Sequence, residues 1–423
     1  MRHRYNYAIA ILSVFLILFS LPASYSNSIA RLGGKCSKLD QRVIIKEKTL
    51  VCKKQSNLLV WRQYKPIVRN RILLSDVIWA TSKTSNYPIQ DFSFPIPKKR
   101  VSSWSDLLIN SEGIPYQAWK YTSMSHKNSK SKVGKIISFV GPNTIPTYPD
   151  LRSAMDSISR AFPTASEVNQ TKIFLYNYSD LEWAKQTYQK EIENETGNFK
   201  LFNSKSIEEN CDKLRQVCWA MGFTDSNLEG IILLGILEEG SQIKQNQTFD
   251  EYARSNLGFT LAHEYFHTIQ RKLLGDSWFE MSYTPPSWFI EGSATFAETA
   301  AMNPNSWDGY MHYRTVYSKF VLSNCKYHSE WCVEVNEDKL NDFMQLKHYE
   351  SNWNNFPVPY KYEVSARIIE VLVALKGPES IVELMQKMGQ RLTFDQAFEL
   401  VYGLSYSEAI PIISKIVAQD LSK

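Results

Sequence analysis

The chain has 423 residues, of which 43% are hydrophobic and 22% are charged. This composition is typical of globular proteins, and it excludes a disordered chain, a fibre and a small scaffold held by disulfides alone. The formal charge of +5 is weak and spread along the chain, so it indicates neither nucleic acid nor an anionic membrane as a partner. The length predicts two or three structural units. We expect the protein to be a monomer.

Residues 1–26 have the pattern of a secretory signal peptide. Two arginines give a positive start, residues 8–21 form an apolar run, and Pro22 ends that run. The run is shorter than the roughly 20 residues that a membrane-spanning helix needs. We therefore expect export and a secreted or cell-surface protein, with an uncleaved anchor as the alternative.

The six cysteines form three local pairs along the chain. An exported protein with an even number of cysteines favours disulfides, and we expect neighbours to pair, although other connectivities are open. A metal site that includes His328 is the alternative for the last pair. The expected pairs are Cys36 with Cys52, Cys211 with Cys218, and Cys325 with Cys332.

Residues 31–65 predict a small disulfide-linked β module, because short apolar runs alternate with polar turns around Cys36 and Cys52. The segment ends with a Lys-rich turn and Trp61. It resembles the small cysteine-paired β module that precedes many exported actinobacterial proteins. The resemblance implies association with the cell envelope, and a purely structural cap is the alternative.

Residues 66–135 predict a linker or irregular region, because prolines interrupt its periodicity and 123–135 is polar. The main domain is expected to begin near Lys135. Strands are predicted at 136–140, 171–178 and 230–237, the last of them apolar enough to be buried on both faces. A helix that Asp150 caps lies between the first two strands, and another follows through Ile192. We expect an α+β fold.

The segment 259–275 carries the strongest chemical signal. His263 and His267 are four positions apart, so on a helix they project from one face, and their spacing lets both imidazoles bind one Zn²⁺ at about 2.0–2.1 Å. Glu264 directly follows the first histidine and would point beside the metal at its water. Gly275 is expected to end this helix.

A second segment, 286–298, completes the candidate set. Glu291 opens a second predicted helix, and Thr295 and Glu298 follow at i+4 and i+7 on the same face. A carboxylate ligand from Glu291 would leave one zinc position open. Thr295 or Glu298 could hold a ligand imidazole through its other nitrogen. The alternative is that Glu291 only caps a helix.

The two segments, HEYFH and WFIEGSA, resemble the gluzincin metallopeptidases, which include thermolysin and the aminopeptidase N-type enzymes. The resemblance implies zinc ligation by His263, His267 and Glu291, with Glu264 as general base and acid. It also implies a zincin-like two-lobed domain. Residues 136–278 would be the first lobe, with a mixed sheet and the active-site helix, and 279–423 would be a mostly helical second lobe. The gap between His267 and Glu291 is longer than usual, and a surface loop absorbs such length.

Aminopeptidase N-type enzymes also carry a tyrosine that stabilises the oxyanion, at the start of a helix. The segment 360–385 resembles that pattern with Ser365 in place of glycine. The resemblance makes Tyr362 the candidate donor, with Tyr360 beside it and His312 and His348 as weaker candidates. A core or surface tyrosine is the alternative.

In the same enzymes a glutamate on an edge strand binds the free amine of the substrate. The segment 235–239 lies at a comparable distance upstream but lacks the family's Met and Asn, so Glu238 is either an amine ligand or the polar end of a strand. We expect an extended peptide to lie along an edge strand near 231–238. The predicted function is a secreted zinc metallopeptidase, and the alternative is a catalytically inactive zincin-fold binding protein at the cell surface.

Overall fold

The computed structural model describes residues 31–39, 42–45, 48–63, 93–146, 148, 150–165, 168–193, 203–238, 257–323, 334–347 and 351–422. The predicted signal peptide lies outside the described residues, as do Cys325, His328, Cys332 and His348. In the part that is described, no helix has the length and apolar character to cross a membrane.

The described strands belong to three sheets. The strands are β1 (Arg42–Ile45), β2 (Lys48–Gln55), β3 (Leu58–Gln63), β4 (Lys135–Val140), β5 (Gln170–Tyr176), β6 (Cys211–Asp212), β7 (Val217–Cys218), β8 (Met221–Thr224) and β9 (Gly230–Gly235). Strands β1–β3 form an antiparallel sheet, β6 and β7 form a short hairpin, and the other four form a mixed sheet.

Helices make up most of the remaining chain. The α-helices are α2 (Ile114–Asn128), α3 (Leu151–Ala161), α4 (Leu181–Tyr188), α6 (Ser204–Glu209), α9 (Phe259–Leu274), α10 (Ser287–Met302), α11 (Trp307–Ser323), α12 (Glu337–Met344), α13 (Ser365–Lys376), α14 (Glu379–Gly389), α15 (Phe394–Tyr402) and α16 (Tyr406–Leu421). The short 3-10 and π segments that matter below are η5 (Gly275–Phe279) and η9 (Tyr360–Val364).

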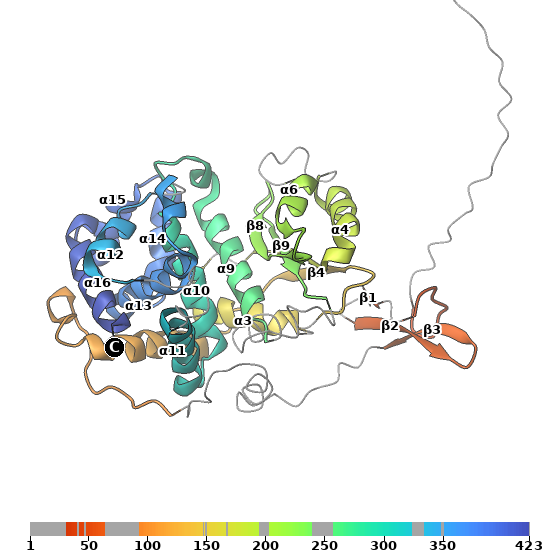
Figure 1. Ribbon diagram of the computed structural model, residues 1–423, viewed down its shortest axis with the longest axis horizontal. Coiled ribbons are helices and arrows are strands. Elements are labelled where there is room, and N and C mark those ends of the chain that lie inside the picture. Colours follow the sequence, from red (N-terminus) through yellow and green to blue (C-terminus); the bar gives the residue numbers. More distant parts are fainter. Residues whose placement is uncertain are drawn as a thin grey trace, which may run out of the picture.

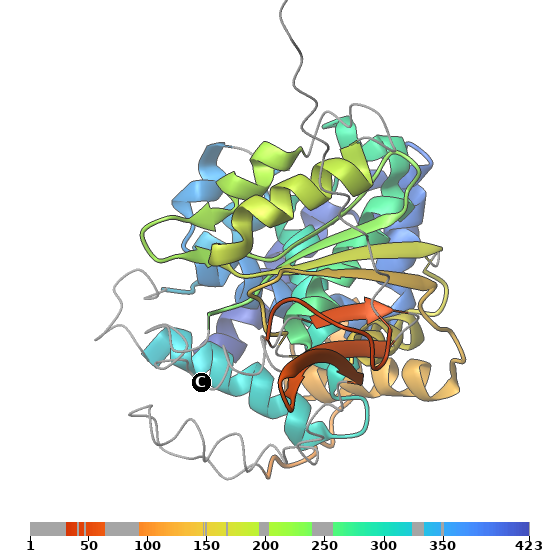
Figure 2. The same ribbon diagram turned by 90° about the vertical axis from the view of Figure 1, so that its right-hand side faces the viewer.

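The mixed sheet has the order β4-β5-β9-β8, in which β8 is antiparallel and the other three strands are parallel. Alternate side chains of β5 face opposite layers, since side-chain direction alternates along a strand. Ile173 and Leu175 belong to the large core that includes α3 and α9, whereas Phe174 and Tyr176 pack in the core with α4 and α6. The sheet is therefore covered on both faces (Figure 2).

Helix α9 stands between the mixed sheet and the helical part of the chain (Figure 1). It packs against β8 and β9 on one side and against α10 and α14 on the other. From α10 onward the described chain is helical. These observations confirm an α+β fold with a mixed sheet followed by a helical region, and the three predicted strands correspond to β4, β5 and β9.

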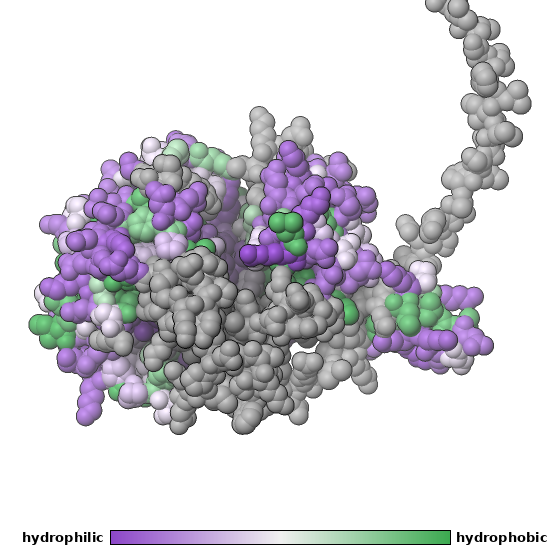
Figure 3. Space-filling model, in the orientation of Figure 1, coloured by the Kyte–Doolittle hydropathy of each residue, from purple (hydrophilic) through white to green (hydrophobic). Residues whose placement is uncertain are grey.

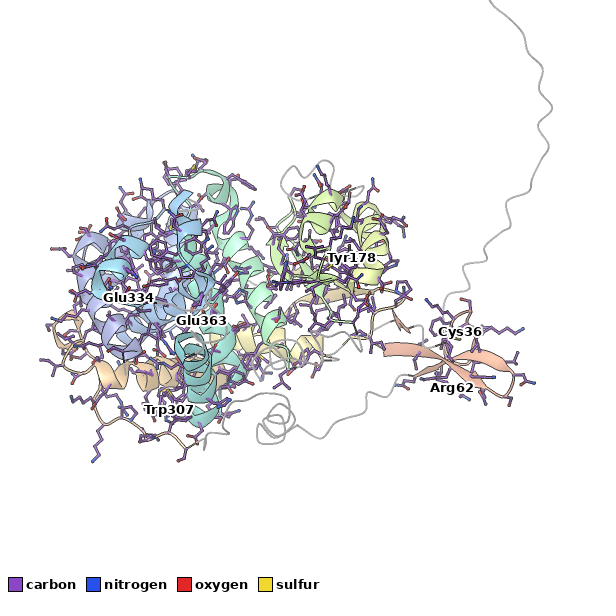
Figure 4. The ribbon with its side chains drawn as sticks, viewed as in Figure 1. Cys36, Arg62, Tyr178, Trp307, Glu334 and Glu363 are labelled. Atoms are coloured by element: carbon purple, nitrogen blue, oxygen red, sulfur yellow. A yellow bond between two sulfur atoms is a disulfide. The ribbon has the colours of Figure 1, made fainter. Side chains whose placement is uncertain are left out.

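The N-terminal sheet β1–β3 extends from one end of the molecule in Figure 4, where Cys36 and Arg62 are labelled. A disulfide joins Cys36 to Cys52, and a second joins Cys211 to Cys218 across the β6–β7 hairpin. Both predicted neighbour pairings are therefore present. The third predicted pair is outside the described residues.

The prediction that 66–135 is a linker is wrong for its second half. Helix α2 lies within this range and packs against α3 and α13. Ala118 and Trp119 are buried in the main core, and the Trp119 indole donates to the carbonyl of Asn303 at 2.9 Å. The polar tail of 123–135 masked this helix, because its apolar residues lie just upstream of that segment.

Candidate metal centre

Helix α9 begins and ends at glycines whose backbone has positive φ. Gly258 has φ 86°, and a Cβ there would lie 2.7 Å from the Tyr148 ring, so the chain turns into the helix only with glycine. Gly275 has φ 53° and ends the helix as predicted. Between them His263 and His267 share one face and Glu264 lies beside them, all three in the same cleft.

Helix α10 brings Glu291 to that face. The Gln270 side chain of α9 donates to the carbonyl of Ile290 and to the Ser293 hydroxyl, both at 2.8 Å, and so links the two helices. The helix begins at Ser287, four residues before Glu291, so this carboxylate is not at a helix N-terminus. The alternative that Glu291 only caps the helix does not hold.

Three ligand atoms converge at this point. The Nε2 atoms of His263 and His267 are 3.0 Å apart, and the Glu291 Oε2 is 3.5 Å and 3.4 Å from them. Tetrahedral bonds of about 2.0–2.1 Å to zinc would place neighbouring donors about 3.3 Å apart. The donor set of two imidazoles and one carboxylate, grouped within 4.8 Å, therefore fits one zinc ion.

The other ring nitrogens face polar groups. His267 Nδ1 lies 2.7 Å from Gln270 Oε1, and His263 Nδ1 lies 3.5 Å from Glu298 Oε2. The contact with Gln270 orients the His267 ring so that its Nε2 faces the candidate ligand site. Glu298 therefore lies beside His263, although its Oε2 and His263 Nδ1 do not form a hydrogen bond with each other. The buried Thr295 hydroxyl has no hydrogen bond among the described residues.

Glu264 has the electrostatics of a proton acceptor. Burial raises its pKa, and Glu291 and Glu298 raise it further, while His263 and His267 lower it. A carboxylate with a raised pKa takes up a proton near neutral pH more readily than an ordinary glutamate does. The residue is buried but lines the cleft, so a water molecule in the cleft can reach it.

The ligand residues polarise one another strongly. Burial alone would lower the pKa of His263, but Glu298 and Glu291 raise it to about 10. Burial would raise the pKa of Glu291, but the two histidines hold it far below its usual range. Buried groups whose pKa values move this far apart are characteristic of functional sites.

A cleft of about 670 Å³ opens over these residues. Figure 3 shows the molecule hollowed between the helical part and the mixed-sheet part. The lining comes from β8 with the segment before it, from α9 with η5, and from α10 and η9. The lining residues are Asn210, Trp219, Ala220, Met221, Gly222, Phe223, Thr224, Thr260, His263, Glu264, His267, Arg271, Trp278, Ile290, Glu291 and Tyr362.

The wall of the cleft opposite α10 is β8, which is the edge of the described mixed sheet. The prediction that 231–238 contains the edge strand is wrong, because β9 lies between β5 and β8. Gly222 of β8 touches the backbone of α9 directly: a Cβ there would be 2.0 Å from the Glu264 carbonyl oxygen. Strand order was not readable from the sequence, since a short strand before β9 gives little signal.

The two candidate tyrosines have different positions. Tyr362 lines the cleft, and its ring centroid is 6.1 Å from that of His263. Tyr360 is buried, and its hydroxyl donates to the carbonyl of Glu334 at 2.7 Å, in the helical part where Figure 4 labels Glu334. The geometry therefore selects Tyr362 over Tyr360 as a group that can meet a ligand in the cleft.

The remaining candidates lie elsewhere. Glu238 accepts from the backbone amide of Ser179 at 3.0 Å and does not line the cleft, which matches the alternative of a polar strand end. His312 is buried in α11 outside the cleft, and burial lowers its pKa to about 4. His348 lies outside the described residues.

Sequence reasoning missed Gln270 and Arg271, which follow His267 on α9. Both are buried polar residues, and their spacing of three and four from a predicted ligand on the same helix was the available signal. Trp219 and the strand β8 were also missed, because only the fold brings them to the site.

In comparisons with known proteins, no family model matches this chain, no curated protein matches it, and no solved structure matches it. The function must therefore be inferred from the geometry of the site.

Proposed function

We propose that this protein is a secreted zinc metallopeptidase that hydrolyses peptide bonds. The observation that carries the proposal is the convergence of His263, His267 and Glu291 around one point, at donor separations that suit zinc, with Glu264 beside it in an open cleft. A zinc ion bound there would polarise a carbonyl and make water a nucleophile near neutral pH.

The residues of the chain have separate roles in this reaction. Glu264 takes a proton from the attacking water and returns it to the leaving amine. The Tyr362 hydroxyl donates to the oxygen that becomes negative in the transition state. Gln270 and Glu298 keep the two imidazoles in the orientation that ligation needs.

The arrangement of the cleft supports an extended peptide as substrate. β8 presents an edge to the cleft, and all four of its residues line it. A peptide that pairs with this edge would pass the ligand site with its backbone carbonyls at a fixed distance from Glu264. The sheet edge, the helix with both histidines and the helical second region are the parts expected of a zincin-like two-lobed domain.

The test is a digest of a mixed-sequence peptide library by the purified protein, read by mass spectrometry. We expect cleavage that a zinc chelator stops and that added zinc restores. The same digest with Glu264→Gln separates a peptidase from a binding protein, because this variant should retain zinc without cutting. A wild-type protein that binds zinc and cuts no peptide would favour the inactive binding protein.

Secretion and contact with the cell envelope belong to the same proposal. Two disulfides form among the described residues, as expected of an exported protein. N-terminal sequencing of the protein from the culture medium and from cell-envelope fractions tests both points. Recovery only from the cytoplasm, with the first residue intact, would contradict export.

A further inference from the structure

The cleft contains a cation beyond the candidate metal ligands. His263, His267 and Arg271 follow one another at intervals of four residues on α9, so they lie on one face of the helix, and all three line the cleft. Four residues advance a helix by about 6 Å. Arg271 therefore occupies the cleft one turn beyond the second histidine.

The guanidinium of Arg271 lies against aromatic rings. Its carbon is 3.9 Å from the centroid of the Phe279 ring and 5.3 Å from that of Trp278. One nitrogen donates to the carbonyl of Gly275 at 2.7 Å. The residue as a whole is only 5% exposed. Rings and carbonyl thus hold the guanidinium in one place, in a residue that lines the cleft.

This buried cation has no carboxylate partner in the described chain. An arginine has five N–H donors, and one carbonyl occupies one of them. Arg271 forms no ion pair with any residue that the structure describes. Burial lowers the pKa of Arg271 to about 10, and the charge of Asp276 raises it slightly from a distance. The guanidinium therefore keeps its charge at neutral pH. A buried charge without a counter-ion is costly, and an incoming carboxylate would remove that cost.

The charges in the rest of the cleft make this position selective. With zinc bound at the ligand site, its charge of +2 would offset the charges of Glu264 and Glu291, which line the same cleft. Arg271 lies one helical turn away and attracts a carboxylate. Because an extended peptide advances about 3.3 Å per residue, the separation of about 6 Å corresponds to one or two residues along the substrate.

We propose that Arg271 is a specificity-determining residue that binds a carboxylate of the peptide substrate, one or two residues from the bond that is cut. The carboxylate belongs either to an acidic side chain or to the C-terminus of the peptide. The proposal rests on the proposed peptidase function for its consequence, while the binding itself depends only on the cleft.

The first test uses wild-type protein and a set of peptides derived from one cut sequence. In one pair of peptides, Glu or Gln stands one residue from the cut bond, and in a second pair it stands two residues away. Each peptide is made with a free and with an amidated C-terminus. We expect a loss of kcat/KM on the order of tenfold to a hundredfold when the recognised carboxylate becomes an amide. Loss on Glu-to-Gln exchange identifies a side chain as the source, and loss on amidation identifies the C-terminus.

The second test uses variants. Arg271→Gln should abolish the preference and leave kcat/KM for the neutral peptide within a few-fold, whereas Arg271→Lys should retain part of the preference. Arg391→Gln is the matched control, since Arg391 is exposed and pairs with Glu280 outside the cleft lining. A purely structural Arg271 would instead lower the melting temperature and slow all peptides equally.

Binding separates this proposal from the peptidase itself. The Glu264→Gln variant holds peptides without cutting them, so fluorescence anisotropy gives the affinity of each labelled peptide. Preferential binding of the carboxylate peptides, lost in the double variant with Arg271→Gln, supports the inference even if the wild type cuts nothing. Equal affinity and equal cutting of acid and amide peptides would overturn it.

Discussion

Two clusters of buried titratable side chains differ in how their charges are matched. The guanidinium cluster consists of Tyr310 and Arg314 of α11, Arg367 and Glu370 of α13, and Asp420 of α16. Arg314 donates to Glu370 at 2.7–3.0 Å and to Asp420 at 2.6 Å. The imidazole cluster consists of His263, Glu264, His267, Glu291 and Glu298. Its three candidate ligand atoms, the Nε2 of both histidines and the Oε2 of Glu291, lie 3.0–3.5 Å apart.

The guanidinium cluster has two cations and two carboxylates, each donor near an acceptor, so its members link three helices in a neutral network. The imidazole cluster has three carboxylates and two imidazoles, and four of its five members line an open cleft. An excess of buried carboxylates over positive charge is costly, and a bound cation would reduce that cost. The first cluster therefore serves folding, and the second is suited to bind a metal.

Replacing the proposed base should give the largest effect. Glu264→Gln is expected to lower kcat by on the order of 10³-fold to 10⁴-fold, because Glu264 is the one carboxylate among the described lining residues that is not a candidate metal ligand. The melting temperature and the zinc content should be unchanged, as judged by thermal scans and by metal analysis. Full activity of this variant would place the imidazole cluster in the same structural role as the guanidinium cluster.

Breaking the guanidinium cluster should affect stability alone. Glu370→Gln leaves Arg314 and Arg367 short of a carboxylate, and removal of one partner of a buried pair costs about 3–5 kcal/mol. Urea unfolding measures that loss. Zinc affinity, measured by competition with a chelating dye, should equal the wild-type value; a matched loss of both would mean that the two clusters are coupled.

The tyrosines allow a matched pair of variants. Tyr362→Phe should lower kcat on the order of 10²-fold with little change in KM or zinc content, because it removes a donor to the transition state. Tyr360→Phe loses only the hydrogen bond to Glu334 and should lower the free energy of unfolding by about 1 kcal/mol while kcat is retained. The opposite outcome would exchange their roles.

A variant of Glu298 tests whether this carboxylate helps His263 to bind zinc. Glu298→Gln replaces the carboxylate that faces His263 Nδ1, and we expect zinc affinity to fall about 10–100-fold. Thr295→Val is the control on the same helix, since no hydrogen bond of the Thr295 hydroxyl is found in the described chain. Equal affinities for the wild type and the Glu298 variant would show that His263 needs no such contact.

A carboxyl outside both clusters should give the smallest effect. Burial raises the pKa of Glu379, at the start of α14, to about 7, above its unfolded value near 4.5. The folded state thus binds the Glu379 proton more tightly than the unfolded state does. The stability that this proton contributes is therefore full at pH 4 and is lost as the pH rises through 7. Glu379→Gln should match the wild type at pH 4 and exceed its stability at pH 8 by about 1 kcal/mol. Parallel melting curves at both pH values would contradict this.

Local patterns made much of the molecule predictable. The four-residue spacing of His263 and His267 predicts a shared helix face, and Asp150 predicts a helix start, because both depend on neighbours in sequence. The continuous apolar run of β9 likewise predicts a strand that is buried on both faces, as the structure confirms.

Features that depend on distant contacts were not predictable. The packing of α2 into the main core requires α3 and α13, which come later in the chain. The edge position of β8 depends on strand order, which a four-residue strand cannot signal. The position of Arg271 in the cleft depends on its contact with Phe279, which the sequence does not show. From the sequence alone, an arginine on a helix is ordinarily a surface residue.

The contact of Gly222 with the Glu264 carbonyl oxygen has a mechanical consequence. Main chain meets main chain there, with no flexible side chain between them to act as a spacer. The sheet margin and the helix with the proposed base must consequently shift together as one rigid unit. If the cleft widens to admit a larger ligand, the movement must come from the opposite wall, where α10 and η9 carry Glu291 and Tyr362.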